Sequence, residues 1–298
     1  GFSLHRQQLK ILGQDWHHFD VYYHRGEKLR VRLEQELQTG KICSIVYSNP
    51  NNPSWICFTE EELKIIGDLA TKYNVIVIED LAYFGMDFRK DIGTPGEPPF
   101  QPTVAHYTNK YILMISGSKA FCYAGQRIGM MVISDELFHT VAPDLLRYYH
   151  TDNLGYALIY GGIYACSAGV THSAQYGLGA ILKACSDGEY DFIKAVQVYA
   201  MKSAIIKKIF VKNGFTIVYD MDMEEPIADG FYFTVSYPGF TGFDLVEELL
   251  HYGISTSSLN NTGSEHPEGI RVCISFVRED QFDILNERLL IFHRDHPH

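Results

Sequence analysis

The sequence has no long apolar run. Its apolar stretches do not approach the roughly 18 uninterrupted residues that a membrane-spanning helix needs. The first residues also lack the basic segment followed by an apolar segment that marks a secretory leader. Because nothing in the sequence directs the chain out of the cell, we expect the protein in the cytoplasm.

The cysteines and histidines lack the spacings of covalent or metal sites. None of the six cysteines forms a CxxC pair with another, which argues against a disulfide framework and a zinc knuckle and agrees with a reducing compartment. The thirteen histidines do not fall in an HExxH or comparable spacing. We therefore expect no metal site. The cysteines are Cys43, Cys57, Cys122, Cys166, Cys185 and Cys273.

Positive charge is also scarce. The 25 lysines and arginines are outnumbered by 36 acidic residues, which gives a formal net charge of −11. Such a chain repels a phosphate backbone, and it has no basic stripe with interleaved aromatic residues. Nucleic acid is therefore not an expected partner, and the remaining composition is that of a globular protein.

The first half of the chain alternates helical and strand patterns. We expect helices at 4–12, 29–37 and 59–73, the last opened by a capping box at Thr59-Glu60-Glu61-Glu62. Apolar, β-branched runs predict strands at 42–47, 75–79, 111–115 and 129–133, with a loop from 88 to 104 and a helix start at Ser134. Strand, helix and strand in this order predict a βαβ unit and an α/β fold.

The second half changes in texture. Residues 155–184 are rich in Gly, Ala, Tyr and Ser with helical spacing, which predicts closely packed buried helices, and a long helix follows from about 190 to 212. Strands at 215–219, 230–235 and 270–276 mixed with helices predict a smaller α+β domain. We place the boundary near residue 208, which gives domains 1–208 and 209–298.

Polar residues follow three of the expected strands in the first domain. Asn52, Asp80 and Lys119 come after the strands at 42–47, 75–79 and 111–115. The carboxyl ends of parallel strands are where open α/β sheets place their chemistry. Taken singly, Asn52 is an ordinary turn residue, Asp80 an ordinary cap and Lys119 a surface lysine in a Gly/Ser turn. Taken together, they predict a site in which a desolvated lysine acts as an amine nucleophile.

Several short segments together resemble the class I/II aminotransferases, pyridoxal phosphate enzymes of fold type I. The segments are Asn49-Pro50-Asn51-Asn52-Pro53, Asp80-Leu81-Ala82-Tyr83, Ser116-Gly117-Ser118-Lys119 with Arg127 eight residues later, and Arg271 before Ile274-Ser275-Phe276. The resemblance covers the whole chain. It implies a three-layer α/β/α large domain, with a smaller α+β domain after it. It also implies that the N-terminal part of the large domain is missing, with its phosphate-binding turn and ring-stacking aromatic residue.

The resemblance implies a role for each matching residue. Lys119 would form the Schiff base with pyridoxal 5'-phosphate and carry the α-proton. Asp80 would pair with the pyridine nitrogen and keep it protonated. Tyr83 and Asn52 would hydrogen-bond the ring oxygen. The phosphate would be held by Ser116, Ser118 and Arg127, and the substrate carboxylate by Arg271 together with Asn52.

The implied function is transfer of an amino group from an α-amino acid to a 2-oxo acid, in amino acid metabolism and biosynthesis, by a homodimer. A lyase or synthase of the same fold is the alternative, because the same residues labilise other bonds. A relative or fragment without turnover is a further alternative. One departure stands out, since the family commonly continues the Asn-Pro loop with Thr-Gly. Here Ser54-Trp55 follows, and we expect the indole to reshape the loop or line the entrance.

Overall fold

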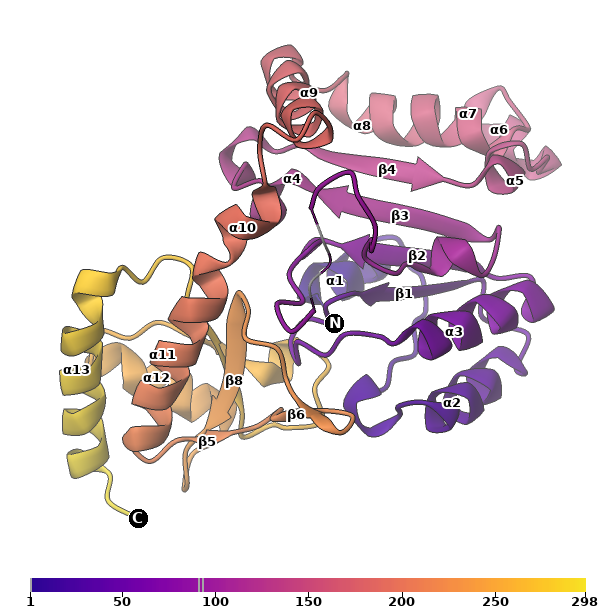
Figure 1. The fold of residues 1–298 in the computed structure, drawn as a ribbon. Coiled ribbons are helices and arrows are strands. Elements are labelled where there is room, and N and C mark those ends of the chain that lie inside the picture. The colour runs from indigo at the N-terminus through magenta and orange to yellow at the C-terminus, as the bar shows by residue number, and fades with distance from the viewer. Residues whose placement is uncertain (1, 91, 93) are drawn as a thin grey trace.

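The computed structural model describes residues 2–90, 92 and 94–298 (Figure 1). In this part of the chain the strands form two four-stranded sheets and a two-stranded hairpin. The first sheet has the order β1-β2-β3-β4, with β1 to β3 parallel and β4 antiparallel to β3. Its strands are β1 Ser44–Ser48, β2 Ile76–Leu81, β3 Tyr111–Ser116 and β4 Gly129–Ile133. All four expected strands are confirmed, and the α/β class with them.

One face of this sheet is covered by α2, Glu27–Leu37, and α3, Glu60–Tyr73. The capping box that opens α3 is confirmed, because Thr59 accepts from the Glu62 amide and Glu62 accepts from the Thr59 amide. The apolar stripes of both helices meet the inward side chains of the strands in one core. The first helix, α1 Ser3–Ile11, lies behind the sheet in Figure 1, on the opposite face.

Strand alternation decides which residues reach that second face. Successive side chains of a strand point to opposite sides, so Glu79 faces the α2–α3 core and Asp80 faces away from it. Asp80 is in register with Ser48 of β1 and Met114 of β3. The strand β2 continues through Leu81, two residues further than expected, so Asp80 lies inside the strand.

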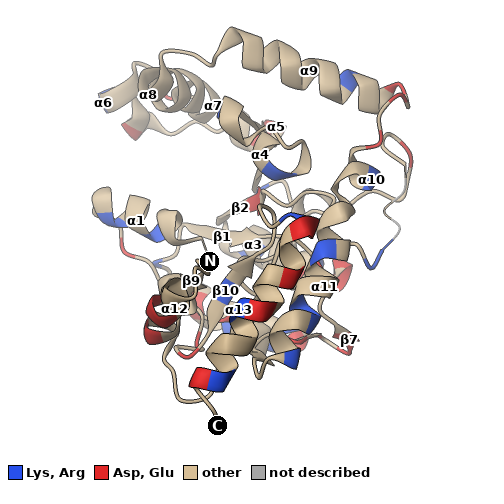
Figure 2. Cartoon of the chain, turned by 90° about the vertical axis from the view of Figure 1, so that its left-hand side faces the viewer, with Lys and Arg blue, Asp and Glu red and all other residues tan. Residues whose placement is uncertain are grey.

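The segment from 154 to 186 is helical but largely exposed, so the expectation of buried helices was wrong. It comprises α7 Leu154–Tyr156, a π-helix Ala157–Tyr164, α8 Ala165–Ser167 and α9 His172–Ser186. Tyr160 is 63% exposed and Tyr176 is 72% exposed. Figure 2 shows these helices almost free of charged residues. Helical spacing of small and aromatic residues therefore set the secondary structure without setting burial.

The second sheet is antiparallel, in the order β5-β8-β10-β9, and packs against α11, α12 and α13. Its observed strands are shorter than the expected ones. The expected helix at 190–212 is divided at Gln197 into α10 and α11. These elements are α10 Phe192–Val196, α11 Val198–Lys212, β5 Thr216–Ile217, β8 Tyr232–Ser236, α12 Gly242–His251, β9 Ser257–Ser258, β10 Ile270–Cys273 and α13 Phe282–Asp295.

The remaining elements are short. The helix expected at Ser134 is confirmed, since Ser134 caps it, but it spans only four residues. The helices are α4 Gly117–Ala120, α5 Asp135–Phe138 and α6 Leu146–Tyr149, with 3-10 turns at Val21–Tyr23, Val104–His106, Ala124–Gln126, Pro143–Leu145, Leu259–Asn261 and Glu279–Gln281. The hairpin consists of β6 Met221–Asp222 and β7 Glu225–Pro226.

Asp222 of this hairpin joins the two halves of the chain. Its carboxylate contacts Arg25, accepts from Arg89 Nη2 at 2.7 Å and accepts from the Cys57 amide at 3.0 Å. Arg25 forms a fork with Glu62 of α3, with both N···O distances 2.8 Å, and Arg89 forms one with Asp87 at 2.9 and 3.0 Å. We call these five charged residues, Arg25, Glu62, Asp87, Arg89 and Asp222, the Asp222 clamp.

Within residues 2–90, 92 and 94–298, no helix is both long enough and apolar enough to cross a bilayer.

Candidate active site

The candidate site lies at the carboxyl ends of β1, β2 and β3. Because these strands are parallel and adjacent, the segments that leave them meet at one edge of the sheet. Asn52 belongs to the loop after β1, Asp80 is the penultimate residue of β2, and Lys119 belongs to the short helix α4 after β3. The three strand exits expected to converge are thus on the same edge.

Asp80 is a largely buried carboxylate. Its Oδ1 accepts from the Ala82 amide at 3.0 Å, and its Oδ2 lies 3.7 Å from His5 Nε2. Burial raises the pKa of Asp80, while His5, the Ala82 amide and Lys119 oppose that shift. A buried carboxyl of this kind gains most from a further cationic partner.

Lys119 points toward the ring of Tyr83. Its Nζ lies 5.6 Å from the ring centroid, within the range of a cation–π contact. Burial lowers the pKa of Lys119, and Arg127 and Arg271 lower it further, while Asp80 acts in the opposite direction. The position therefore makes the ammonium easier to deprotonate than that of an exposed lysine, and the neutral amine is the form that attacks a carbonyl carbon.

A hydrogen bond links Arg271 of the second sheet to Asn52 in the loop that leaves the first sheet. Arg271 Nη1 donates to Asn52 Oδ1 at 2.8 Å, and the guanidinium lies 4.7 Å from the ring centroid of Tyr232. The Asn52 amide donates to Ser48 Oγ at 2.9 Å, which ties the loop to the end of β1. The Nε of Arg271 is buried without a hydrogen-bond partner in the described structure.

Of the three residues expected at the phosphate, Ser116 and Ser118 lie at α4 with Lys119, and Arg127 ends the next 3-10 turn, Ala124–Gln126. Ser116 caps α4, its Oγ accepting from the Ser118 amide at 3.1 Å. Ser118 is half-buried beside it. Arg127 is exposed, and its Nη1 donates to the Ala124 carbonyl at 2.7 Å. Their assignment to a phosphate stays a prediction.

Two residues of the site were not found from the sequence. His5 is one of thirteen histidines, and only the placement of α1 behind the sheet brings it to Asp80. Tyr232 carries the face on which Arg271 rests, and it belongs to a strand that shows no motif. The expectation for Trp55 at the entrance was wrong, because its indole is fully buried behind Tyr83.

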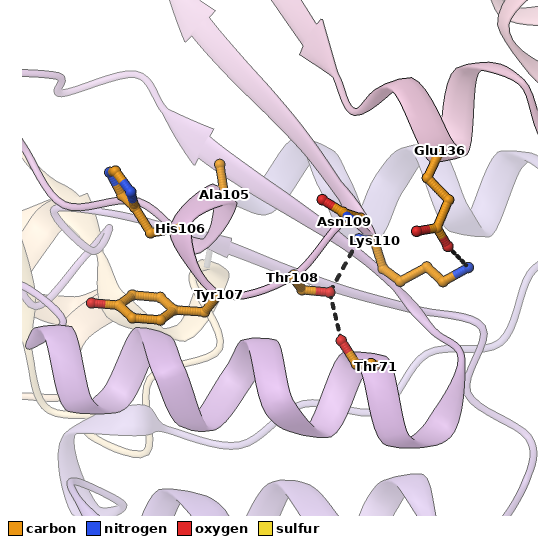
Figure 3. Close-up of a pocket in the computed structure, with 8 residues that line it drawn as sticks. All are labelled: Thr71, Ala105, His106, Tyr107, Thr108, Asn109, Lys110 and Glu136. Carbon is orange, nitrogen blue, oxygen red and sulfur yellow. Dashed lines mark hydrogen bonds and ion pairs between the residues drawn. The ribbon is translucent and has the colours of Figure 1, made fainter.

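A surface pocket of about 380 Å³ lies elsewhere, near the start of β3 and the end of α3 (Figure 3). Its polar groups pair with one another: Lys110 with Glu136 at 2.7 Å, and Thr71 with Thr108 at 2.8 Å. Figure 3 shows these side chains turned toward their partners along the wall. The polar groups of this pocket are thus already paired, and the lining includes none of the candidate site residues around Lys119.

The α/β fold thus places a partly buried lysine and a largely buried carboxyl at one edge of the sheet. The sequence model of the family described as aminotransferase class I and II matches residues 1–160. The chain belongs to this family, whose members depend on pyridoxal phosphate.

Two curated relatives illustrate the match. The probable aspartate aminotransferase of Methanocaldococcus jannaschii is 27% identical over 170 residues, which are 56% of this chain and 40% of that protein. The probable N-acetyl-LL-diaminopimelate aminotransferase of Bacillus subtilis is 24% identical over 227 residues, 76% of this chain and 49% of that protein. The chain thus spans less than half the length of each.

Solved structures show the same fold. An aminotransferase from Mycobacterium tuberculosis has a TM-score of 0.73 at 14% identity, covering 99% of this chain and 68% of that one. An aspartate aminotransferase from Rhodobacter sphaeroides has a TM-score of 0.68 at 16% identity, covering 100% of this chain and 70% of that one. These structures support fold type I for the present chain.

Proposed function

We propose that this protein is a pyridoxal phosphate-dependent aminotransferase that moves an amino group from an α-amino acid to a 2-oxo acid. The observation that carries the proposal is the convergence of Lys119, Asp80 and Tyr83 at one sheet edge, beside the Arg271–Asn52 pair from both sheets. Family membership supplies the reaction class.

The donor set fits the cofactor. Asp80 is a buried carboxyl with a raised pKa, which a protonated ring nitrogen would complement. Lys119 is an amine with a lowered pKa, suited to bind an aldehyde carbon covalently through Nζ. Ser116, Ser118 and Arg127 would hold the phosphate. When bound, pyridoxal phosphate supplies an electron sink for the pair of electrons left at the substrate α-carbon.

The chain's own residues have three tasks. The amine of Lys119 would take a proton from the substrate α-carbon at Nζ and later give it back. The Asp80 carboxylate, which lies 3.7 Å from His5 Nε2, would hold the protonated pyridine nitrogen of the cofactor. Tyr83 and Asn52 would donate hydrogen bonds to the hydroxyl oxygen on the cofactor's ring.

Arg271 binds the substrate carboxylate in this proposal. Its guanidinium is fixed from two directions, by the 2.8 Å bond to Asn52 and by the Tyr232 ring 4.7 Å below it. A planar fork held in this way suits a carboxylate and fixes which bond to the α-carbon faces the ring.

We also propose that the protein works as a homodimer in the cytoplasm, with units near 1–208 and 209–298. The exposed, nearly uncharged surface of α7 to α9 is a suitable interface (Figure 2). All six cysteines are free, which suits a reducing compartment. Sedimentation of the intact protein as a monomer would contradict the homodimer.

The activity is tested by incubating the intact protein and pyridoxal phosphate with a panel of amino acids and 2-oxo acids, followed by amino acid analysis. We expect amino transfer, reduced at least about 1000-fold by Lys119→Ala because the attacking amine is gone. The control is Lys212→Ala, which removes an exposed lysine of α11 and leaves the activity unchanged.

Two results would contradict the proposal. Full activity in Lys119→Ala would show that Lys119 is not the nucleophile. Release of ammonia or an olefin without amino transfer would identify a lyase of the same fold instead.

A further inference from the structure

Trp55 has a backbone conformation that bulky residues rarely adopt. Its φ is +66°, in the left-handed region that favours glycine. The loop around it is pinned, because the Trp55 amide donates to the Asn51 carbonyl and the Asn51 amide donates to the Ile56 carbonyl, both at 2.8 Å. A strained conformation that persists under such restraint is a mark of functional sites.

The indole lies between two other rings. Trp55 is fully buried, 5.0 Å from the Tyr83 ring and 4.8 Å from the Tyr232 ring. Tyr83 and Tyr232 themselves meet edge to face at 5.3 Å. We call Trp55, Tyr83 and Tyr232 the aromatic triad. Edge-to-face packing of this kind fixes both the separation and the tilt of the rings.

Gly230 makes room for the indole. A Cβ added at Gly230 would lie 2.0 Å from Cε2 and 2.1 Å from Cζ2 of Trp55. No side chain fits there unless the indole moves. The indole therefore rests directly on the backbone that leads into β8, and it links the loop after β1 to the second sheet.

The triad supports the two cationic groups of the site. Lys119 Nζ lies 5.6 Å from the ring of Tyr83, and the Arg271 guanidinium lies 4.7 Å from the ring of Tyr232. Arg271 also donates to Asn52, three residues before Trp55. The two ring contacts therefore reach Trp55 through one intervening residue each, Tyr83 for Lys119 and Tyr232 for Arg271.

We propose that Trp55 is a positioning residue that sets Tyr83 and Arg271 relative to Lys119 by wedging the aromatic triad between the two sheets. The inference rests on the proposed function, because Tyr83 is taken to donate to the cofactor's ring oxygen and Arg271 to bind the substrate carboxylate. Trp55 itself is proposed to touch neither the cofactor nor the substrate carboxylate.

The first test follows the emission of Trp55 while pyridoxal phosphate is added to the apoprotein. The chain has two tryptophans, so Trp16→Phe leaves Trp55 as the sole emitter. We expect saturable quenching, because the indole is one ring away from the cofactor position, and loss of this quenching when Lys119→Ala is added. Unchanged Trp55 emission on saturation would overturn the proposal, and this measurement needs no substitution at Trp55.

The second test uses Trp55→Phe and, from the other side of the indole, Gly230→Ala. Both substitutions should hold Tyr83 less firmly, so that it donates a weaker hydrogen bond to the anionic ring oxygen of the cofactor. The midpoint of the pH titration that follows the bound cofactor's absorbance should then rise by about half a unit, a threefold change in proton affinity. If Arg271 is held less firmly, KM for the amino acid should rise about tenfold while kcat changes much less.

The matched control is Trp16→Phe, the same substitution at a tryptophan that is 39% exposed. It should change neither the midpoint nor KM. If Trp55→Phe melts cooperatively and behaves like Trp16→Phe in both readouts, Trp55 only fills the core and the proposal is wrong. If the wild-type protein binds no pyridoxal phosphate, the proposed function fails first, and this inference falls with it.

Discussion

Two groups of charged residues lie where the two halves of the chain meet, and they differ in how completely their polar groups are bonded. In the Asp222 clamp, all three guanidinium nitrogens of Arg25 and of Arg89 donate to a carboxylate or a carbonyl. In the site, Arg271 has one such bond and a buried Nε without a partner in the described structure.

The pKa directions follow the same division. Burial raises the pKa of Asp80 and lowers that of Lys119, so in both groups burial works against the charged form. In the clamp, Arg89 lowers the pKa of Asp87 against the effect of burial. Charged groups whose hydrogen bonds are all made within the protein stabilise the fold, whereas charged groups with unsatisfied hydrogen-bonding capacity can bind a ligand. The clamp should therefore govern stability and the site should govern binding.

The largest expected effect comes from breaking the clamp. Asp222→Ala leaves the partly buried Arg25 and Arg89 without their shared carboxylate, and we expect a loss of about 3–5 kcal/mol in the free energy of unfolding. Urea titration of the apoprotein measures this loss. The control is Glu225→Gln, on the next strand of the hairpin, whose carboxylate is 72% exposed and 4.0 Å from Arg89. It should cost less than about 1 kcal/mol. Equal losses in the two variants would contradict the role of the clamp.

The contrast between the two groups also explains what the sequence could predict. Asn52, Asp80 and Lys119 were predictable because parallel strands bring their carboxyl ends to one edge, whatever the rest of the chain does. Asp222 was not, because its partners Arg25 and Arg89 are remote in sequence and nothing local marks any of them as buried. Burial depends on tertiary packing, which also explains why the helices after residue 154 were wrongly expected in the core.

Glu79 gives the next effect and sharpens the comparison, since it is a buried carboxyl with neutral partners. It accepts from Asn49 Nδ2 at 3.3 Å and from the Val104 amide at 2.9 Å. Burial raises the pKa of Glu79 from 4.5 to about 7. The folded state therefore binds more protons than the unfolded state between these pH values, and stability falls as pH rises through them, by roughly 3 kcal/mol in all.

Glu79→Gln should remove this part of the pH dependence. Urea unfolding at pH 5 and at pH 8 should show a smaller difference between the two conditions in the variant than in the wild-type protein. The control is Glu136→Gln, which changes a carboxylate that is 48% exposed. If Glu79→Gln keeps the wild-type difference, Glu79 is not the titrating group.

The smallest expected effect is in the site. Arg271→Lys keeps the charge but removes the planar fork, so we expect KM for the amino acid to rise about 10- to 100-fold while the unfolding midpoint stays close to that of the wild-type protein. Steady-state kinetics and a thermal melt measure the two. Arg288→Lys, on the exposed face of α13, serves as the control. A stability loss as large as that of Asp222→Ala would place Arg271 with the structural arginines.

The central claim is that Lys119 uses its amine for the cofactor, and reduction with borohydride tests it most directly. The intact protein is incubated with pyridoxal phosphate, reduced, digested and mapped by mass spectrometry. We predict a single major modified peptide, carrying the pyridoxyl group on Lys119. Modification of another lysine, or of none, under conditions in which the protein remains folded would contradict the account.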